Sequence, residues 1–364
     1  MSLPQILAII VFAGMFIAIM RGKMHRFVPA LIGAAVTAVL ILALVDDGPR
    51  SLWHVLRLYD FVDPHWWYGK HVAEAAHEAT SDGGPEIGGV NWQTMIFIGG
   101  MMVMVEGMGA AGFFRWLCLL VAKLVRYRVI PILVSFMLLS GFLSMFIDSI
   151  TVMLFLATVT IELARLLKFD PVPVIIAEIF ASNTGGSATM SGDPPNIIIG
   201  TSLGYTFSDF VVNTGPIAGL SMIVALLYFY VVLRKPLAAT EQRNTGAEAV
   251  VYPEPGQAIQ DGRGFVLHSG IFVLVVVLLV TQALTGISVA LIGVVTAVLT
   301  MLASGRNALR VLRNIDWRTL LFFIGLFMLV GALQENGVFL WLGRQMLRLT
   351  SGNLIERADR LQVR

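Results

Sequence analysis

The chain has 364 residues, of which 57% are hydrophobic and 13% are charged, with a formal net charge of +2 at pH 7. Soluble domains carry roughly 25% charged residues, so the composition argues against a soluble enzyme and a disordered scaffold. The small net charge argues against nucleic-acid binding, and the single cysteine excludes a disulfide framework and a multi-thiolate metal site. The class that remains is an all-α polytopic membrane protein.

Apolar runs, most of them near the roughly 20 residues that cross a bilayer, recur along the whole chain. They cover 3–20, 27–45, 92–112, 211–233, 265–284, 287–303 and 320–333, with further runs at 129–147, 149–161 and 172–203. The first run has no basic segment before it and no small-residue cleavage site, so we expect a retained span rather than a signal peptide.

The basic residues predict the orientation of these spans. They concentrate between the first two runs, in 115–128, after 164, in 234–264 and in 306–318, whereas the loop 46–91 is acidic. An N-terminus outside the cell (inner) membrane keeps most basic residues in the cytoplasm. The segment 129–164 must then enter and return, as two full helices or as a re-entrant hairpin with Asp148 near its turn. An ordinary external loop around Asp148 is the alternative.

A weak internal duplication relates residues 91–117 to residues 316–342. At a constant offset the identical pairs are Trp92/Trp317, Thr94/Thr319, Phe97/Phe322, Gly100/Gly325, Val105/Val330, Gly112/Gly337, Trp116/Trp341 and Leu117/Leu342. The letters ALIG also occur at both 30–33 and 290–293. The charge rule gives the two copies opposite directions, which predicts an inverted repeat as in alternating-access carriers. We expect a first repeat over 1–233, a cytoplasmic linker over 234–264 and a second repeat over 265–364.

Residues 181–196 interrupt an apolar span with hydroxyl, amide and carboxylate side chains, a Gly-Gly pair and a Pro-Pro pair. A continuous helix accommodates these pairs poorly, and non-helical backbone within a bilayer persists only inside protein or along a wet cavity. We expect a discontinuous helix over about 172–203, with two half-helices around an unwound loop. A proline-kinked helix is the alternative.

Asp148, Ser149 and Thr151 form a matching polar tip in the segment 129–164. A carboxylate inside the membrane costs roughly 3 kcal/mol or more, so it is a functional candidate by default. Asp148 can hold Na⁺ or H⁺ but not both, which is the simplest basis for antiport. No Lys or Arg accompanies the acids of these two segments, which favours a cation or a neutral hydroxylated solute. We expect Glu178 near the cytoplasmic edge of its span.

The stretch SNTGGSATMSGDPPN at 182–196 resembles the signature SNxGGxATxxGDPPN of the ArsB/NhaD permeases, a family of the ion transporter superfamily. FIDSITVMLFLATV at 146–159 is similar to the hairpin motif FLDNVTTVLLLAPV of that family. The family includes arsenite efflux carriers, NhaD-type sodium/proton antiporters and the P protein, with citrate and dicarboxylate carriers as more distant relatives. The resemblance covers almost the whole chain.

The resemblance implies an inverted-repeat ion transporter fold, a homodimer and a substrate site shared by the hairpin and the broken helix. The residues it points to are Asp148, Ser149, Thr151, Ser182, Asn183, Thr184, Gly185, Gly186, Asp193 and Asn196. A bound Na⁺ would use Asp148, Ser149 and Asn183. Ser149 stands where the family motif has Asn, which removes an amide ligand. The second copy stops before its own hairpin and broken helix, so we expect an incomplete second repeat.

These observations predict a secondary active transporter rather than an enzyme, embedded in the lipid bilayer and carrying a small inorganic ion. Sodium/proton antiport is favoured, with Na⁺ or H⁺ as the coupling ion and no other cofactor. Arsenite or antimonite efflux, with an ATPase partner if it is a pump, is the first alternative. A truncated fragment that needs a partner for the missing half-site is another, and a citrate or dicarboxylate carrier is less favoured.

Overall fold

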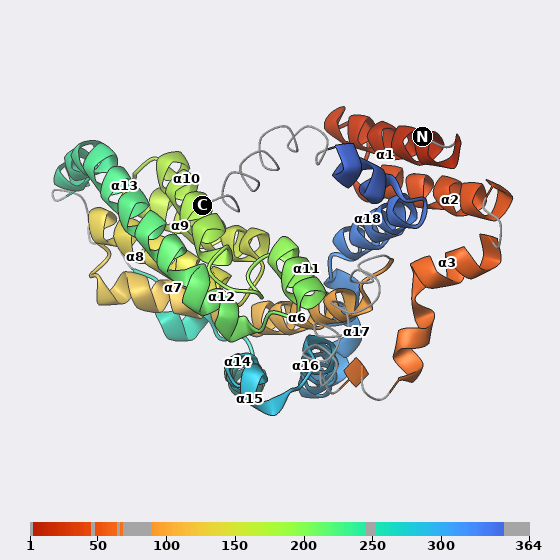
Figure 1. Cartoon of the computed structure of the whole chain (residues 1–364). Helices are drawn as coiled ribbons and strands as arrows, with labels where there is room; N and C mark the ends of the chain where they lie inside the picture. The colour runs from red at the N-terminus through yellow and green to blue at the C-terminus, as the bar shows by residue number, and fades with distance from the viewer. Residues whose placement is uncertain (1–2, 45–47, 64–65, 68–88, 245–251, 346–364) are drawn as a thin grey trace, which may run out of the picture. The chain divides into compact units, whose positions relative to one another are not determined.

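The computed structural model describes the chain except residues 1–2, 45–47, 64–65, 68–88, 245–251 and 346–364 (Figure 1). Every secondary-structure element within this described part is a helix. Seven helical segments are long and apolar enough to cross a membrane. They are Leu3–Met20, Trp92–Ala111, Ser149–Leu167, Gly215–Ala238, Gly262–Val280, Val289–Asn314 and Trp317–Glu335. The predicted all-α polytopic membrane protein is therefore confirmed.

The described helices form two compact units. The first combines residues 1–64 and 79–95 with 316–364. Its elements are α1 (Leu3–Met20), α2 (Phe27–Leu44), α3 (Gly48–Leu56), the 3₁₀ turn η1 (Leu58–Val62) and α18 (Trp317–Glu335). Met15, Ala30 and Leu329 make a buried cluster where α1, α2 and α18 pack together.

The second unit comprises residues 65–78 and 96–315. Its elements are α6 (Trp92–Ala111), whose first residues belong to the other unit, α7 (Phe113–Leu124), α8 (Val129–Ser144), α9 (Ser149–Leu167), α10 (Pro171–Gly186), α11 (Pro194–Leu203), α12 (Phe207–Asn213), α13 (Gly215–Asn244), η2 (Pro255–Ala258), α14 (Gly262–Val280), α15 (Gln282–Thr285), α16 (Val289–Ser304), η3 (Gly305–Asn307) and α17 (Ala308–Asn314). Helix α10 packs against α8, α9 and α13 (Figure 1), so α8 and α10 form the centre of this group.

The two copies of the sequence duplication exchange partners in the fold. Helix α6 of the first copy crosses α16 of the second so closely that a Cβ at Gly100 would lie 2.1 Å from the Gly293 carbonyl oxygen. In the other unit, α18 of the second copy packs on α2 of the first, and a Cβ at Gly325 would lie 2.8 Å from the Ala30 carbonyl oxygen. Each unit thus contains one pair made of both copies, because small residues at corresponding places permit the crossing.

The compact units consequently cut across the repeat boundaries expected from sequence. Residues 234–244, placed in a linker by the charge pattern, continue α13 beyond Pro236. The expected loop 46–91 contains α3 and η1, while its residues 68–88 lie outside the described part.

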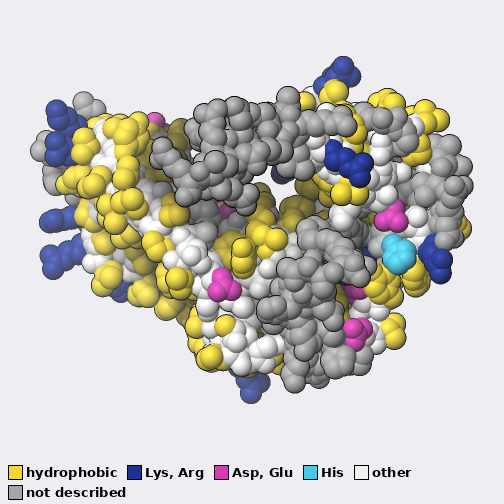
Figure 2. Space-filling view, viewed as in Figure 1, with side chains coloured by type: hydrophobic (Ala, Val, Ile, Leu, Met, Phe, Trp, Pro, Cys, Tyr) yellow, Lys and Arg dark blue, Asp and Glu magenta, His cyan; other side chains and the backbone are white. Residues whose placement is uncertain are grey.

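Helix α13 presents apolar side chains outward along most of its length. Ile217, Leu220, Ile223 and Leu227 are each more than half exposed. Figure 2 shows hydrophobic side chains spread across the face over α13. A contiguous exposed apolar surface of this kind suits contact with lipid acyl chains rather than with water.

Candidate functional site

A short turn separates α8 from α9, and Asp148 sits at its end. Asp148 is the N-cap of α9, where its Oδ2 accepts hydrogen bonds from the Thr151 amide and hydroxyl, both at 3.0 Å. Helix α8 ends at Ser144, so the turn of residues 145–148 is short. The carboxylate therefore stabilises the positive end of a helix inside the second unit.

A second interruption separates α10 from α11 over residues 187–193. Pro194 and Pro195 occupy the first positions of α11, where a missing N–H costs nothing, and so they mark the start of a new helix. The Asn196 amide closes the loop by donating to the Gly186 carbonyl at 3.1 Å and the Thr189 carbonyl at 2.9 Å.

The two interruptions meet. The Ser149 hydroxyl donates to Asp193 Oδ1 at 2.7 Å, and the Ser182 hydroxyl donates to the Ser149 carbonyl at 2.9 Å. The hydroxyls of Thr189 and Ser191 both donate to the carbonyl of Met145 in the hairpin turn. Three hydroxyls of the broken helix thus bind backbone carbonyls of the hairpin, which satisfies polar groups that lipid would leave unpaired.

Glycines allow this close approach. A Cβ at Gly185 would lie 2.0 Å from the Gly141 carbonyl oxygen, which shows that α10 touches α8 backbone to backbone. A Cβ at Gly192 would lie 2.4 Å from the Ser144 carbonyl oxygen. Gly186 leaves room for the carboxylate of Asp193, which a Cβ would approach to 2.5 Å. The Gly-rich sequence is therefore required by packing at the break.

The site contains two carboxyl groups, those of Asp148 and Asp193, for which no basic partner is found among the described residues. Asp148 and Asp193 are brought together through Ser149, which follows Asp148 in the chain and donates its hydroxyl to Asp193. Within the described residues, no Lys or Arg forms an ion pair with either carboxylate. Two carboxylates that share a partly buried site favour a cation or a proton between them.

The helix N-termini at the site offer little to an anion. Pro194 and Pro195 have no N–H, and the Thr151 amide of α9 already donates to Asp148. A helix N-terminus binds an anion through free backbone N–H groups, and these groups are removed or occupied here. The groups that remain are carboxylate, hydroxyl and carbonyl oxygens, which hard cations prefer.

The remaining predicted site residues take different places. Asn183 is exposed on α10, whereas Ser149 is buried. Among the described residues, no hydrogen bond joins the three proposed sodium ligands Asp148, Ser149 and Asn183. The Thr184 hydroxyl donates to the Phe180 carbonyl of its own helix at 2.8 Å. Asn183 and Thr184 therefore flank the contact between the two breaks.

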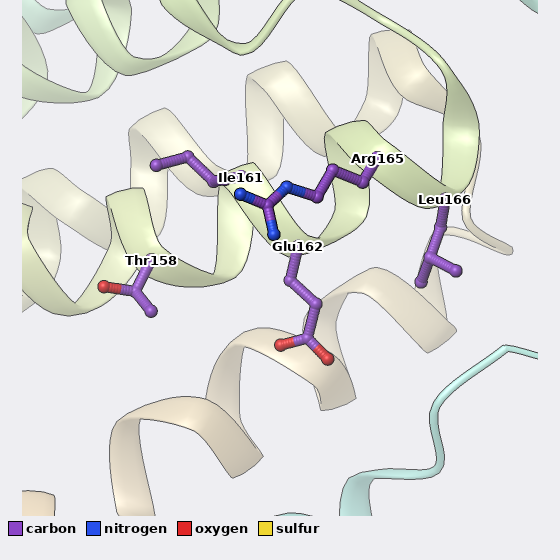
Figure 3. A pocket seen from close by; sticks show the side chains of 5 residues that line it. All are labelled: Thr158, Ile161, Glu162, Arg165 and Leu166. Atoms are coloured by element: carbon purple, nitrogen blue, oxygen red, sulfur yellow. The ribbon is translucent and has the colours of Figure 1, made fainter.

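A separate pocket of ≈570 Å³ lies along the C-terminal half of α9 (Figure 3). Its lining residues are Thr158, Ile161, Glu162, Arg165 and Leu166, and Glu162 is paired with Arg115 of α7 at 2.7 Å. At 1.5 Å per residue, Thr158 is roughly 15 Å along the helix from Asp148. This pocket is distinct from the contact between the breaks.

A buried line of polar groups between α8 and α10 was not predicted from the sequence. Ser140 donates to the Glu178 carbonyl at 2.9 Å, and Ser144 shares a 2.5 Å hydrogen bond with Ser182. Glu178 is wholly buried in this line, and its place near the cytoplasmic edge of its span stays a prediction. A spacing of four between polar residues on two apolar helices is the signal that would have indicated this line.

Apolar spanning helices and two interruptions that meet at buried polar groups define a polytopic membrane transporter. The family model for the citrate transporter family, CitMHS, matches residues 15–355, and the chain belongs to this family. The resemblance to the ion transporter superfamily, noted from the motifs, is confirmed.

The chain is also similar to individual proteins. It is 28% identical over 355 residues to an uncharacterized transporter of Mycobacterium tuberculosis, a match covering 97% of this chain and 74% of the relative. A 46 kDa membrane protein of Mycobacterium leprae is 27% identical over 350 residues, with 96% of this chain and 73% of the relative covered. The human P protein is 32% identical over 193 residues, 53% of this chain and 19% of that protein.

Proposed function

We propose that the protein is a secondary active transporter that exchanges Na⁺ for H⁺ at the contact between the hairpin and the broken helix. The observation that carries the proposal is the hydrogen bond from Ser149 to Asp193, because it joins the two interruptions beside two carboxylates. In this mechanism Na⁺ binds the ionised carboxylates from one side of the membrane. A proton replaces it on Asp148 from the other side, so the two ions compete for one site.

Citrate transport is the second candidate, and the description of the family model favours it. A citrate anion would enter a site with two carboxylates, for which the described residues supply no basic partner. Electrostatics then requires cations to be bound with it or before it. The two candidates therefore share a cation requirement and differ in whether an organic anion moves.

The test is flux into proteoliposomes made with the full chain, under separate gradients of Na⁺, H⁺, arsenite and citrate. We expect a Na⁺ gradient to drive proton movement without citrate or arsenite. Citrate uptake that depends on a cation would support the second candidate instead. Arsenite flux alone, or no flux in any arm, would contradict the proposed exchange.

Asp148→Asn tests the site itself. The amide retains the capping geometry but removes the charge, so we expect Na⁺-driven proton movement to be lost while expression is retained. Asp170→Asn is the matched control, because Asp170 caps α10 through the Val172 amide on an exposed surface. Coupled flux that persists in Asp148→Asn would exclude Asp148 from the site.

A further inference from the structure

Glu178 places a carboxyl group in the centre of the helix group, apart from the contact between the breaks. Its side chain is 0% exposed. Oε1 accepts a hydrogen bond from the Thr160 hydroxyl of α9 at 2.5 Å. Oε2 is buried and has no hydrogen-bond partner among the described residues. Half of this carboxyl group is therefore satisfied and half is not.

No basic group described around Glu178 balances its charge. Helix α8 contains no ionisable residue. On α7, Cys118 is buried, while Arg115 pairs with Glu162 and Lys123 with Glu254. On α9, Glu162 is paired with Arg115, and Arg165 lines the outer pocket beside it. The described ionisable residues of α13 are all exposed or partly exposed, namely Tyr228, Tyr230, Arg234 and Lys235.

The described surroundings of Glu178 do not fully hydrogen-bond either of its protonation states. The ionised form has one buried oxygen without a donor, which costs several kcal/mol in a medium of low polarity. The neutral form carries its O–H on Oε2, the atom for which no hydrogen-bond partner is found among the described residues. Buried polar groups with a purely structural role are normally fully hydrogen-bonded, so the unmatched oxygen points to a group that changes state.

Glu178 is also connected to the helices that build the site. Its carbonyl accepts from Ser140, and one turn further along both helices Ser144 binds Ser182. Ser182 in turn donates to the carbonyl of Ser149. A charge that appears on Glu178 therefore acts on the α8 and α10 pair whose ends form the two breaks.

We propose that Glu178 is a second proton-binding site of the transporter, which takes up one proton on Oε2 and releases it once in each cycle. The carboxylate and a proton form the carboxylic acid, and the same O–H bond breaks on release. This assignment rests on the proposed exchange at Asp148. With one proton at Asp148 and one at Glu178, each cycle moves two protons against one Na⁺. The exchange then carries net charge and responds to membrane potential.

Infrared difference spectroscopy of the purified full chain tests the proton directly. We expect a carbonyl band of a protonated carboxylic acid that appears and disappears with pH and is lost in Glu178→Gln. Thr160→Val leaves the acid in place and should shift the frequency of the band, because the hydrogen bond to Oε1 is removed. Glu162→Gln, on the outer surface of α9, is the matched control and should leave the band unchanged.

A band unaffected by Glu178→Gln, or one that never titrates across the stable pH range, would overturn the assignment. In proteoliposomes, we expect wild-type Na⁺ exchange to respond to an imposed potential and any exchange left in Glu178→Gln to lose that response. Unchanged potential dependence in Glu178→Gln would also contradict the proposal. A wild-type chain that titrates at Glu178 but moves no Na⁺ would refute the proposed exchange alone.

Discussion

At the scale of single residues, Ser149 links the two breaks. Its hydroxyl donates to Asp193, and its carbonyl accepts from Ser182. Ser149 therefore contacts the broken helix on both sides of its interruption. A serine here replaces the asparagine of the family motif, and its short side chain still reaches the carboxylate. The geometry thus gives the hydroxyl the role of holding Asp193 in place.

We expect Ser149→Ala to lower the apparent affinity of the transporter for Na⁺. A hydrogen bond to a charged group contributes about 1.5–3 kcal/mol, which corresponds to roughly a 10- to 150-fold increase in the half-saturating Na⁺ concentration. The concentration dependence of flux in proteoliposomes measures the change. Ser221→Ala is the control, since that exposed hydroxyl binds only the Ile217 carbonyl of its own helix. An equal effect in both variants would contradict the role of Ser149.

At the scale of helices, glycine at crossing points decides which spans pair. The Gly100–Gly293 crossing of α6 and α16 brings backbone against backbone, and α2 meets α18 near Gly325 in a similar way. These positions belong to the duplicated segments, so the duplication preserved the residues that let one copy pack on the other. The pairing therefore depends on small residues rather than on hydrophobicity, which every span shares.

Gly100→Ala should destabilise the second unit. The added methyl group would lie 2.1 Å from a backbone oxygen of α16, and relief requires the helices to separate, at about 1–3 kcal/mol. Gly270→Ala is the matched control, because a Cβ there meets nothing within 4 Å on α14. Thermal unfolding of the detergent-solubilised chain compares the two variants. Similar melting temperatures for both would show that the crossing tolerates separation.

At the scale of the whole molecule, the charge pattern predicts the direction in which the chain threads the membrane. The loop between α1 and α2 contains Arg21, Lys23 and Arg26, and the turn after α11 contains no basic residue. The positive-inside rule places the first loop in the cytoplasm and the second outside.

Introduced cysteines test this orientation. The chain has a single native cysteine, Cys118, which is buried and can be replaced by serine to give a background without thiols. In that background, we expect Tyr205→Cys to react with an impermeant maleimide on intact cells. Lys23→Cys should react only after the membrane is opened. The opposite labelling pattern would invert the predicted topology.

The sequence by itself determined the membrane class, most of the spans and the two interruptions. These features are local. A long run of apolar residues requires a bilayer or a protein core. Gly185-Gly186 followed by Pro194-Pro195 ends one helix and starts another, whichever helices surround the segment. The family motifs covered the same residues. None of this required knowledge of which helices touch.

Tertiary structure alone decided the contacts across the chain. Ser149 and Asp193 are 44 residues apart, and only the packing of α8 against α10 brings the two breaks together. The burial of Glu178 and the exchange of helix partners between the copies have the same origin. In a chain where nearly every span is apolar, hydrophobicity cannot select neighbours. Close glycine contacts and hydrogen bonds between distant residues make that selection.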